Sequence, residues 1–274
     1  MKKIIGAFFA VAALASPAFA GKNGSATLIK SAVASRSQDA IIAEVERTEK
    51  LVCSECVPIV AELTQDSRLA VREVAAWWFA KRPGLQKQFA KQFLAELATG
   101  DTIQVRNAAD FLGRSSTFTA LPQLATAIQR TDIGAEGQLA IVRALKHLAM
   151  PEGNTALAYA MTVTDASVRA AAANAWRDIR GQTGAAPVVA LLRDSDAVVR
   201  AAAAATVGGL VELSGRSTLE QLVVSDPNVF VRRNAAWALG KLHAPASAAS
   251  LSQAMNDSSG LVRMTARVAL GQLH

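Results

Sequence analysis

A motif that recurs along most of the chain constrains the fold more than any other feature. Four copies share an Asp six residues before the Arg of a Val-Arg pair, followed by small residues: "DSRLAVREVAAWWFAKR" from Asp66, "DSDAVVRAAAAATVGGL" from Asp194, "DPNVFVRRNAAWALGKL" from Asp226 and "DSSGLVRMTARVALGQL" from Asp257. The bulky residue after the small ones returns at steps of 31 to 33, at Phe79, Leu112, Leu145, Trp176, Val207, Leu239 and Leu270. A period of this length predicts an array of similar units and not one globular core.

Each copy of the motif has the pattern of a helix. Its apolar residues recur every three or four positions after a residue suited to an N-cap. Shorter copies start at Asp101 and Asp165, and a degenerate copy from Glu136 has Gln138 in the arginine position. Second helical segments such as "LQKQFAKQFLAELA" and "LPQLATAIQR" lie between copies, and strand-like alternation is absent. A pair of such helices cannot bury its apolar face alone, so we expect seven pairs stacked into an all-α solenoid.

The Asp...Val-Arg pattern and the "AAxALG" tail resemble HEAT repeats, specifically the short bacterial type named after phycobilisome lyases, from about Cys56 to Leu273. The resemblance implies a right-handed, armadillo-like superhelix with the second helix of each pair on its concave side. Members of this family mostly provide binding surfaces. The resemblance also implies a ladder of hydrogen bonds in the turns, formed by Asp66 with Arg72, Asp194 with Arg200, Asp226 with Arg232 and Asp257 with Arg263. The shorter spacing of Asp101 to Arg106 and Asp165 to Arg169 leaves the pairing there open.

The first residues, "MKKIIGAFFAVAALASPAFA", have two lysines, a short apolar run and a small-x-small ending. This pattern predicts a cleaved signal peptide over residues 1–20 and a periplasmic or secreted protein without a membrane span. We expect a flexible N-terminus at 21–36, an amphipathic capping helix and joint at 37–55, and the solenoid at 56–274.

Charge and motif content argue against most catalytic functions. The chain has 29 Lys and Arg against 22 Asp and Glu, a net charge of +7 without a basic block, which is compatible with an acidic partner but does not indicate nucleic acid. Its three histidines are scattered and none precedes a glutamate, which excludes a di-iron site of the kind found in HEAT-repeat hydroxylases. Nucleophile elbows, phosphate loops and dinucleotide fingerprints are absent. We therefore expect a non-enzyme with no catalytic residues, no metal and no cofactor.

One stripe of each motif helix is the candidate binding surface. The first, fifth and ninth residues after the arginine lie on this stripe, opposite the buried positions. Tryptophan and arginine dominate binding hot spots, and the stripe has two tryptophans near cations. The candidate partner contacts are Trp77, Lys81, Arg114, Arg143, His147, Arg233, Trp237 and Lys241. The alternative is structural, with each tryptophan lying over a neighbouring repeat and its cations stacked on the ring.

The only two cysteines, Cys53 and Cys56, lie in "KLVCSECVPIV". Val57 occupies the position where a c-type haem motif has histidine, and zinc would need two more ligands that the local sequence lacks. A structural disulfide and an active dithiol remain. Redox-active pairs of the thioredoxin type occur in a βαβ setting, so the all-α pattern favours a disulfide that fixes the joint before the first repeat, contributing about 2 kcal/mol at most.

The sequence thus predicts an exported, non-catalytic scaffold that binds a partner protein of the cell envelope on its concave face. One alternative is a redox-linked accessory protein that uses Cys53 and Cys56. Another is a lyase-like cofactor-binding HEAT protein, an idea that rests on the family's name alone. The sequence does not indicate the oligomeric state.

Overall fold

The structure is a computed structural model that describes residues 25–182 and 184–273. These residues contain sixteen α-helices, five short 3₁₀ turns and no strand, which confirms the predicted all-α architecture. The described residues divide into two compact units, 25–78 and 79–273. The predicted signal peptide at residues 1–20 lies outside the described residues.

The first unit contains two helix hairpins. Its helices are α1 (Ala26–Ser35), α2 (Gln38–Arg47), α3 (Cys56–Leu63) and α4 (Leu69–Ala80), and the last two residues of α4 belong to the second unit. The Trp78 indole N–H donates a hydrogen bond of 2.9 Å to the buried Thr48 hydroxyl, which ties α4 to the end of α2.

The expectation of a flexible segment at residues 21–36 is wrong for its described part. Helix α1 forms because the Ser25 hydroxyl accepts the Leu28 N–H as an N-cap, and because Ala26, Ile29 and Ala32 are buried on one face. This face packs against α2 and α3. The first repeat is therefore preceded by a helix hairpin, of which α2 alone lies in the predicted capping segment at residues 37–55.

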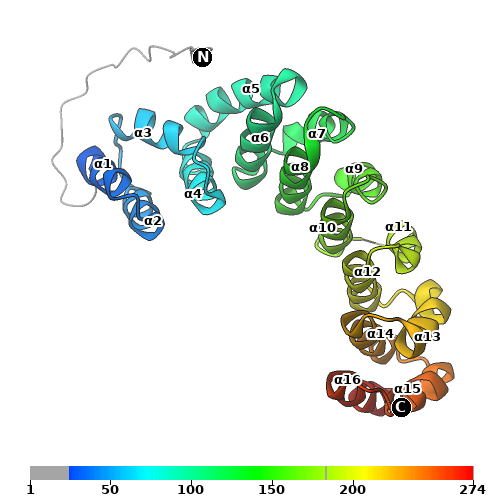
Figure 1. Ribbon diagram of the computed structural model, residues 1–274. Helices are drawn as coiled ribbons and strands as arrows, with labels where there is room; N and C mark the ends of the chain where they lie inside the picture. The colour runs from blue at the N-terminus through cyan, green and yellow to red at the C-terminus, as the bar shows by residue number, and fades with distance from the viewer. Residues whose placement is uncertain (1–24, 183, 274) are drawn as a thin grey trace. The chain divides into compact units, whose positions relative to one another are not determined.

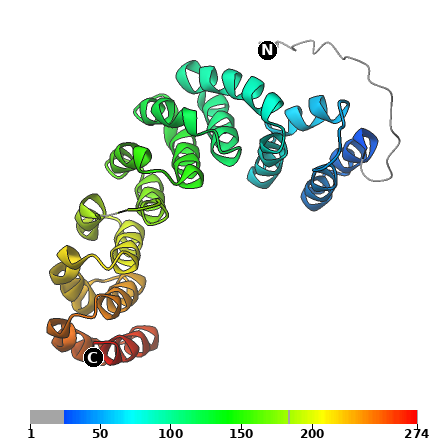
Figure 2. The same cartoon turned by 180° about the vertical axis from the view of Figure 1, so that it is seen from behind.

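The second unit is a stack of helix pairs in two layers (Figures 1 and 2). The outer layer consists of α5 (Pro83–Thr99), α7 (Leu121–Ala127), α9 (Asn154–Ala160), α11 (Ala186–Ala190), α13 (Arg216–Ser225) and α15 (Ala248–Ala254). The inner layer consists of α6 (Thr102–Arg114), α8 (Gly134–Leu148), α10 (Ala166–Trp176), α12 (Ala197–Gly209), α14 (Val229–Lys241) and α16 (Gly260–Gly271). Each inner helix packs on the next inner helix, and the second unit curves with the inner layer on its concave side. With α3 and α4, the described residues thus contain the seven predicted pairs.

Small residues set the spacing between inner helices. A Cβ atom added to Gly113, Gly208 or Gly240 would lie only 2.4, 2.6 or 2.8 Å from the Cα atom of Ala144, Ala238 or Ala269 on the following helix. No side chain fits at such a distance, so each glycine allows the backbones of successive repeats to touch. Gly271 has the same position in α16, but an added Cβ would meet nothing within 4 Å.

Candidate partner-binding surface

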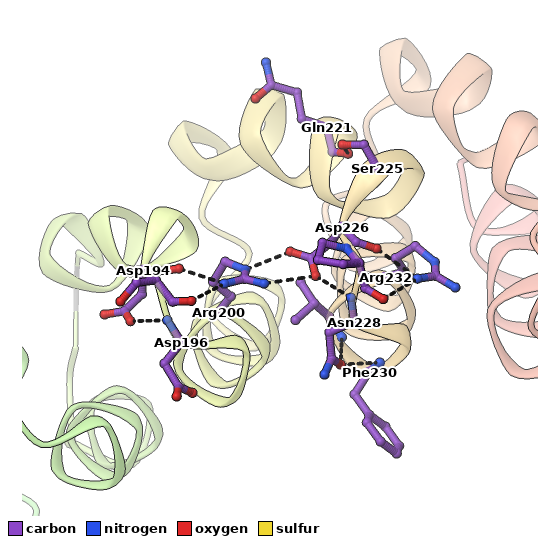
Figure 3. Close-up of polar contacts among 12 residues, drawn as sticks. Asp194, Asp196, Arg200, Gln221, Ser225, Asp226, Asn228, Phe230 and Arg232 are labelled. Atoms are coloured by element: carbon purple, nitrogen blue, oxygen red, sulfur yellow. Dashed lines mark hydrogen bonds and ion pairs between the residues drawn. The ribbon is translucent and has the colours of Figure 1, made fainter.

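The conserved spacing of the motif builds a ladder along one edge of the second unit. In each rung, the guanidinium of one repeat binds the aspartate carboxylate of the next repeat through two hydrogen bonds, as Figure 3 shows for Arg200 and Asp226. The Nε to Oδ2 distances are 2.8, 2.7 and 2.6 Å for Arg169 with Asp194, Arg200 with Asp226, and Arg232 with Asp257. The accepting carboxylates are almost fully buried, so the rungs are shielded from water.

The expected pairing inside one motif needs a correction. Arg200 and Arg232 contact the aspartate of their own motif only through its backbone carbonyl, at 2.8 Å in both cases. Arg72 and Arg263 bind the carbonyl oxygens of Asp66 and Asp257 in the same way, both at 2.7 Å. The carboxylate is turned to the preceding repeat because one of its oxygens accepts a backbone N–H two residues on, as in Asp226 with Asn228.

The ladder is interrupted in the middle of the second unit and has two different ends. Gln138 stands in the arginine position before Asp165, whose carboxylate caps α10 instead by accepting the Ser167 and Val168 N–H groups. In the first unit Arg68, not an arginine of an earlier repeat, binds the carboxylate of Asp66. The motif did not indicate this contact, since Arg68 has no counterpart in the other copies.

The ladder shifts the acid–base equilibria of its members. The hydrogen bonds from Arg169 hold the pKa of Asp194 below its usual range, and those from Arg232 do the same for the pKa of Asp257, although burial opposes both shifts. The same contacts raise the pKa of Arg169, Arg200 and Arg232. These residues are charged and mutually satisfied at neutral pH, so they hold the repeats together and are not available for chemistry.

The inner layer has two regions of different character, and the first comprises α6, α8 and α10. Arg106, Arg143 and Lys146 of this region are paired with acids of neighbouring repeats. The guanidinium of Arg143 lies 2.9 Å from the buried carboxylate of Asp110, and Arg106 lies 2.7 Å from Glu136. The Lys146 ammonium lies 3.1 Å from Asp178. Arg143, a predicted partner contact, is therefore engaged inside the solenoid.

The second region comprises α12, α14 and α16, and large apolar side chains are exposed on it. Exposed fractions are 65% for Val198, 58% for Phe230, 40% for Leu261, 63% for Met264 and 59% for Val268. Leu261, Met264 and Val268 follow each other at three and four residues, so they lie on one face of α16. Val198 and Phe230 have the position of Leu261 in the two preceding helices. Sequence reasoning missed these three positions because it counted the stripe only from the arginine onward.

Trp237 lies in the middle of this second region. Its ring edge covers Gly208 of the preceding repeat, because a Cβ added there would lie 2.8 Å from Trp237 Cζ3. The Lys241 ammonium lies 5.9 Å from the centre of the indole ring. The contact over a neighbouring repeat thus matches the structural alternative, yet Trp237 remains half-exposed on a helix that packs against α16.

The other predicted contacts are spread over the molecule. Trp77 is a half-buried residue of the first unit, whereas Lys81, Arg114 and His147 belong to the second unit. Lys81 and His147 are exposed, and Arg114 is half-buried at the end of α6. Of the eight predicted contacts, Arg233, Trp237 and Lys241 share one stripe of α14 within the apolar region.

Cys53 and Cys56 are joined as a disulfide with their Cα atoms 5.3 Å apart. Cys56 is the fully buried first residue of α3, and its N–H donates to Cys53 Sγ at 3.2 Å. Cys53 is half-exposed. The bond closes the turn that starts α3, which is the position of the joint predicted from the sequence.

Within 25–182 and 184–273, His, Cys, Asp and Glu side chains form no group of three that could hold a metal ion. In the same ranges, no helix has both the length and the apolar character needed to span a bilayer.

Stacked helix pairs, a ladder across the turns and a curved inner layer define an α-solenoid of the second unit. Residues 185–271, which contain α11 to α16, match the family model for HEAT repeats. Pairs with the same two-layer arrangement precede them, so the α-solenoid continues beyond the residues that match HEAT repeats. A search of curated proteins finds no match.

One of the similar solved structures supports the fold assignment. The Escherichia coli protein YibA has a TM-score of 0.58 and 14% identity, with 90% of this chain and 91% of that chain covered. At this identity the likeness shows the fold alone. The CpcE and CpcF complex of phycocyanin lyase from Nostoc is 22% identical over 79% of this chain and 86% of its own, with a TM-score of 0.42. Human deoxyhypusine hydroxylase is 17% identical over 90% and 97%, with a TM-score of 0.40.

Proposed function

We propose that the chain is an exported, non-catalytic scaffold that binds a partner protein on the inner layer of its last three repeats. The observation that carries the proposal is the group of exposed apolar side chains on α12, α14 and α16, which comprises Val198, Phe230, Leu261, Met264 and Val268. Soluble proteins rarely leave large apolar side chains exposed in contiguous groups unless they bind something there. The half-exposed Trp237 adds the residue type most often found at the centre of interfaces.

A site-specific photocrosslinker tests this proposal. Benzoylphenylalanine replaces Phe230 on the inner layer or, as the matched control, Phe118 between α6 and α7, which is also an exposed phenylalanine. In the native envelope we expect a discrete crosslinked protein from position 230 and none of that mass from position 118. Equal crosslinking from both positions, or none from position 230, would contradict the proposal.

The export part of the proposal is supported by the signal-like pattern of residues 1–20 and by the disulfide, which is a bond of oxidising compartments. Cell fractionation combined with the intact mass of the purified protein tests it. We expect an envelope or secreted protein that begins at Gly21. A cytoplasmic protein that retains Met1 and Lys2 would contradict export.

Thiol–disulfide exchange by Cys53 and Cys56 is a second candidate function. It is favoured by the half-exposed Cys53 sulfur at the N-terminus of α3, where the helix dipole and the Cys56 N–H stabilise a thiolate. Equilibration with glutathione measures the reduction potential. A potential near that of known exchange catalysts would support exchange, whereas one below about −300 mV would leave only the structural role.

A further inference from the structure

Two cations on α14, Arg233 and Lys241, differ from the paired cations of α6 and α8 on the inner layer of the second unit. Arg106, Arg143 and Lys146 each have a carboxylate within 3.1 Å. Arg233 and Lys241 have no carboxylate partner among the described residues. Their charge is therefore available to a group from outside the chain.

Arg233 has a further unsatisfied requirement. Its Nε atom is buried and has no hydrogen-bond partner in the described part of the chain, although the residue as a whole is half-exposed. A buried guanidinium donor without an acceptor costs free energy, and a carboxylate bound at the exposed part of the guanidinium would offset this cost by pairing with its charge. The positive charge of the guanidinium and its unpaired N–H donor both favour an anionic acceptor.

The residues around the two cations indicate which other chemical groups the ligand should have. Arg233, Trp237 and Lys241 follow each other at four-residue steps, so they form one stripe about 12 Å long with the indole ring in the middle. Met264 and Val268 on α16 flank the stripe on one side, and Ala201 and Ala205 on α12 flank it on the other. The ligand therefore meets an apolar centre with a positive charge at each end.

We propose that this stripe binds an acidic amphipathic helix of the partner protein. Two carboxylates about 12 Å apart lie on one face of an α-helix when they are seven or eight residues apart, and the same face then presents apolar side chains between them. Such a helix places its apolar side chains on Trp237, Met264 and Val268, while its acids pair with Arg233 and Lys241. This inference rests on the proposed function and names the chemistry of the partner.

Peptide helices of opposite charge, measured against the protein and against a charge-reversed variant, test the inference. The probe is a fluorescein-labelled amphipathic peptide with two glutamates seven residues apart and leucines between them, and a second peptide has lysines in place of the glutamates. By fluorescence anisotropy, the full chain should bind the glutamate peptide and should bind the lysine peptide at least tenfold more weakly. The double variant Arg233→Glu and Lys241→Glu should reverse this preference.

The matched control is the double variant Lys87→Glu and Lys91→Glu on the outer helix α5, where both lysines are exposed. It changes the net charge equally and should leave both affinities within about twofold. Circular dichroism melts establish that each variant folds. Peptide binding that is absent, or that does not depend on the charges at 233 and 241, overturns the inference.

An anionic surface is the competing source of carboxylate or phosphate groups. Binding of the chain to vesicles that contain anionic phospholipid should not depend on Arg233 and Lys241 as peptide binding does. If the vesicles bind more strongly than the glutamate peptide, the inference fails. The crosslink at position 230 separates the two proposals. If the crosslinked protein persists unchanged in the Arg233→Glu and Lys241→Glu variant, the scaffold function stands and the acidic helix is wrong.

Discussion

The two regions of the inner layer are built from the same repeat, but their side chains differ in whether they are paired within the chain. On α6, α8 and α10 the exposed positions carry charges that pair with neighbouring repeats, as Arg143 does with Asp110. On α12, α14 and α16 the same positions carry alanines, Trp237 and large apolar residues, and Arg233 and Lys241 of α14 form no ion pair with an acid of the described residues. In the first region, charged side chains such as Arg143 pair with acids of the chain itself. In the second region, the apolar side chains and the cations of α14 remain available to a ligand.

The ladder shows the opposite gradient. It is regular from Arg169 to Asp257, along the repeats that carry the apolar region, and is interrupted at Gln138 in the repeats with paired charges. A regular ladder fixes the spacing of the repeats without using side chains of the inner face. The last repeats are therefore free to vary that face, and the middle repeats depend on it for cohesion.

The largest expected effect is the loss of a complete ladder rung. Arg232→Ala removes two hydrogen bonds to the buried Asp257 and leaves its charge uncompensated, which should lower the free energy of unfolding by about 3 kcal/mol. The matched variant is Arg263→Ala, which makes the same carbonyl contacts but ends the ladder with an exposed guanidinium. Urea unfolding should show less than about 1 kcal/mol for this control. Equal losses would mean that the carbonyl contacts alone stabilise the turn.

Glycine substitution should give effects of opposite sign at equivalent positions. Gly240→Ala places a methyl group 2.8 Å from the Cα atom of Ala269, so it should destabilise the unit by about 1 to 3 kcal/mol. Gly271→Ala meets nothing within 4 Å and removes a flexible residue from a helix, so it should stabilise by up to about 1 kcal/mol. Thermal melts of the two variants compare the signs directly. Destabilisation by Gly271→Ala would indicate that something covers the end of α16.

The acid stability of the chain should depend on the ladder. Asp194 and Asp257 have pKa values below their usual range because of Arg169 and Arg232, so their contribution is fully present above the unfolded pKa of about 3.9. It is lost as the pH falls through the lowered folded pKa values, below about pH 4. Unfolding midpoints measured between pH 7 and pH 2 should be flat down to about pH 4 from these groups and fall below it. The fall should be smaller in Arg232→Ala, and an unchanged slope would contradict the assignment for Asp257.

Much of the fold but only part of the surface could be predicted from the sequence. The repeat period determines the seven pairs because each pair must bury its apolar face on the next one. The ladder residues were recognised, yet Asp226 was assigned to Arg232 of its own motif, since the spacing does not reveal that its carboxylate is turned by the Asn228 N–H toward Arg200. Helix α1 was missed because it lies before the first copy of the motif, and its buried face of Ala26, Ile29 and Ala32 is explained only by the contacts with α2 and α3.

The inner surface was harder to predict for a similar reason. Arg143 and Arg233 are both cations of the predicted stripe, and only contacts between repeats distinguish them. Asp110 lies 33 residues before Arg143 and satisfies it, while Arg233 has no acid in the described neighbouring helices. A pattern confined to one repeat cannot contain this information, because it depends on which side chains two repeats place side by side.

The substitution with the smallest expected effect on stability distinguishes a role in binding from a role in folding most clearly. Lys241→Met keeps the length and the apolar stem of the side chain and removes only the charge beside Trp237, a cation–π contact worth about 0.5 to 1 kcal/mol at an exposed site. Lys146→Met on α8 removes an exposed ion pair with Asp178 and should cost about as little. Only Lys241→Met should weaken binding of the glutamate peptide, by about fivefold or more, and lower the crosslinking yield from position 230. If the two variants bind alike, the Trp237 and Lys241 contact serves packing alone. If Lys241→Met loses binding while its melting temperature is almost unchanged, the Lys241 charge contributes to partner binding and adds little to the stability of the solenoid.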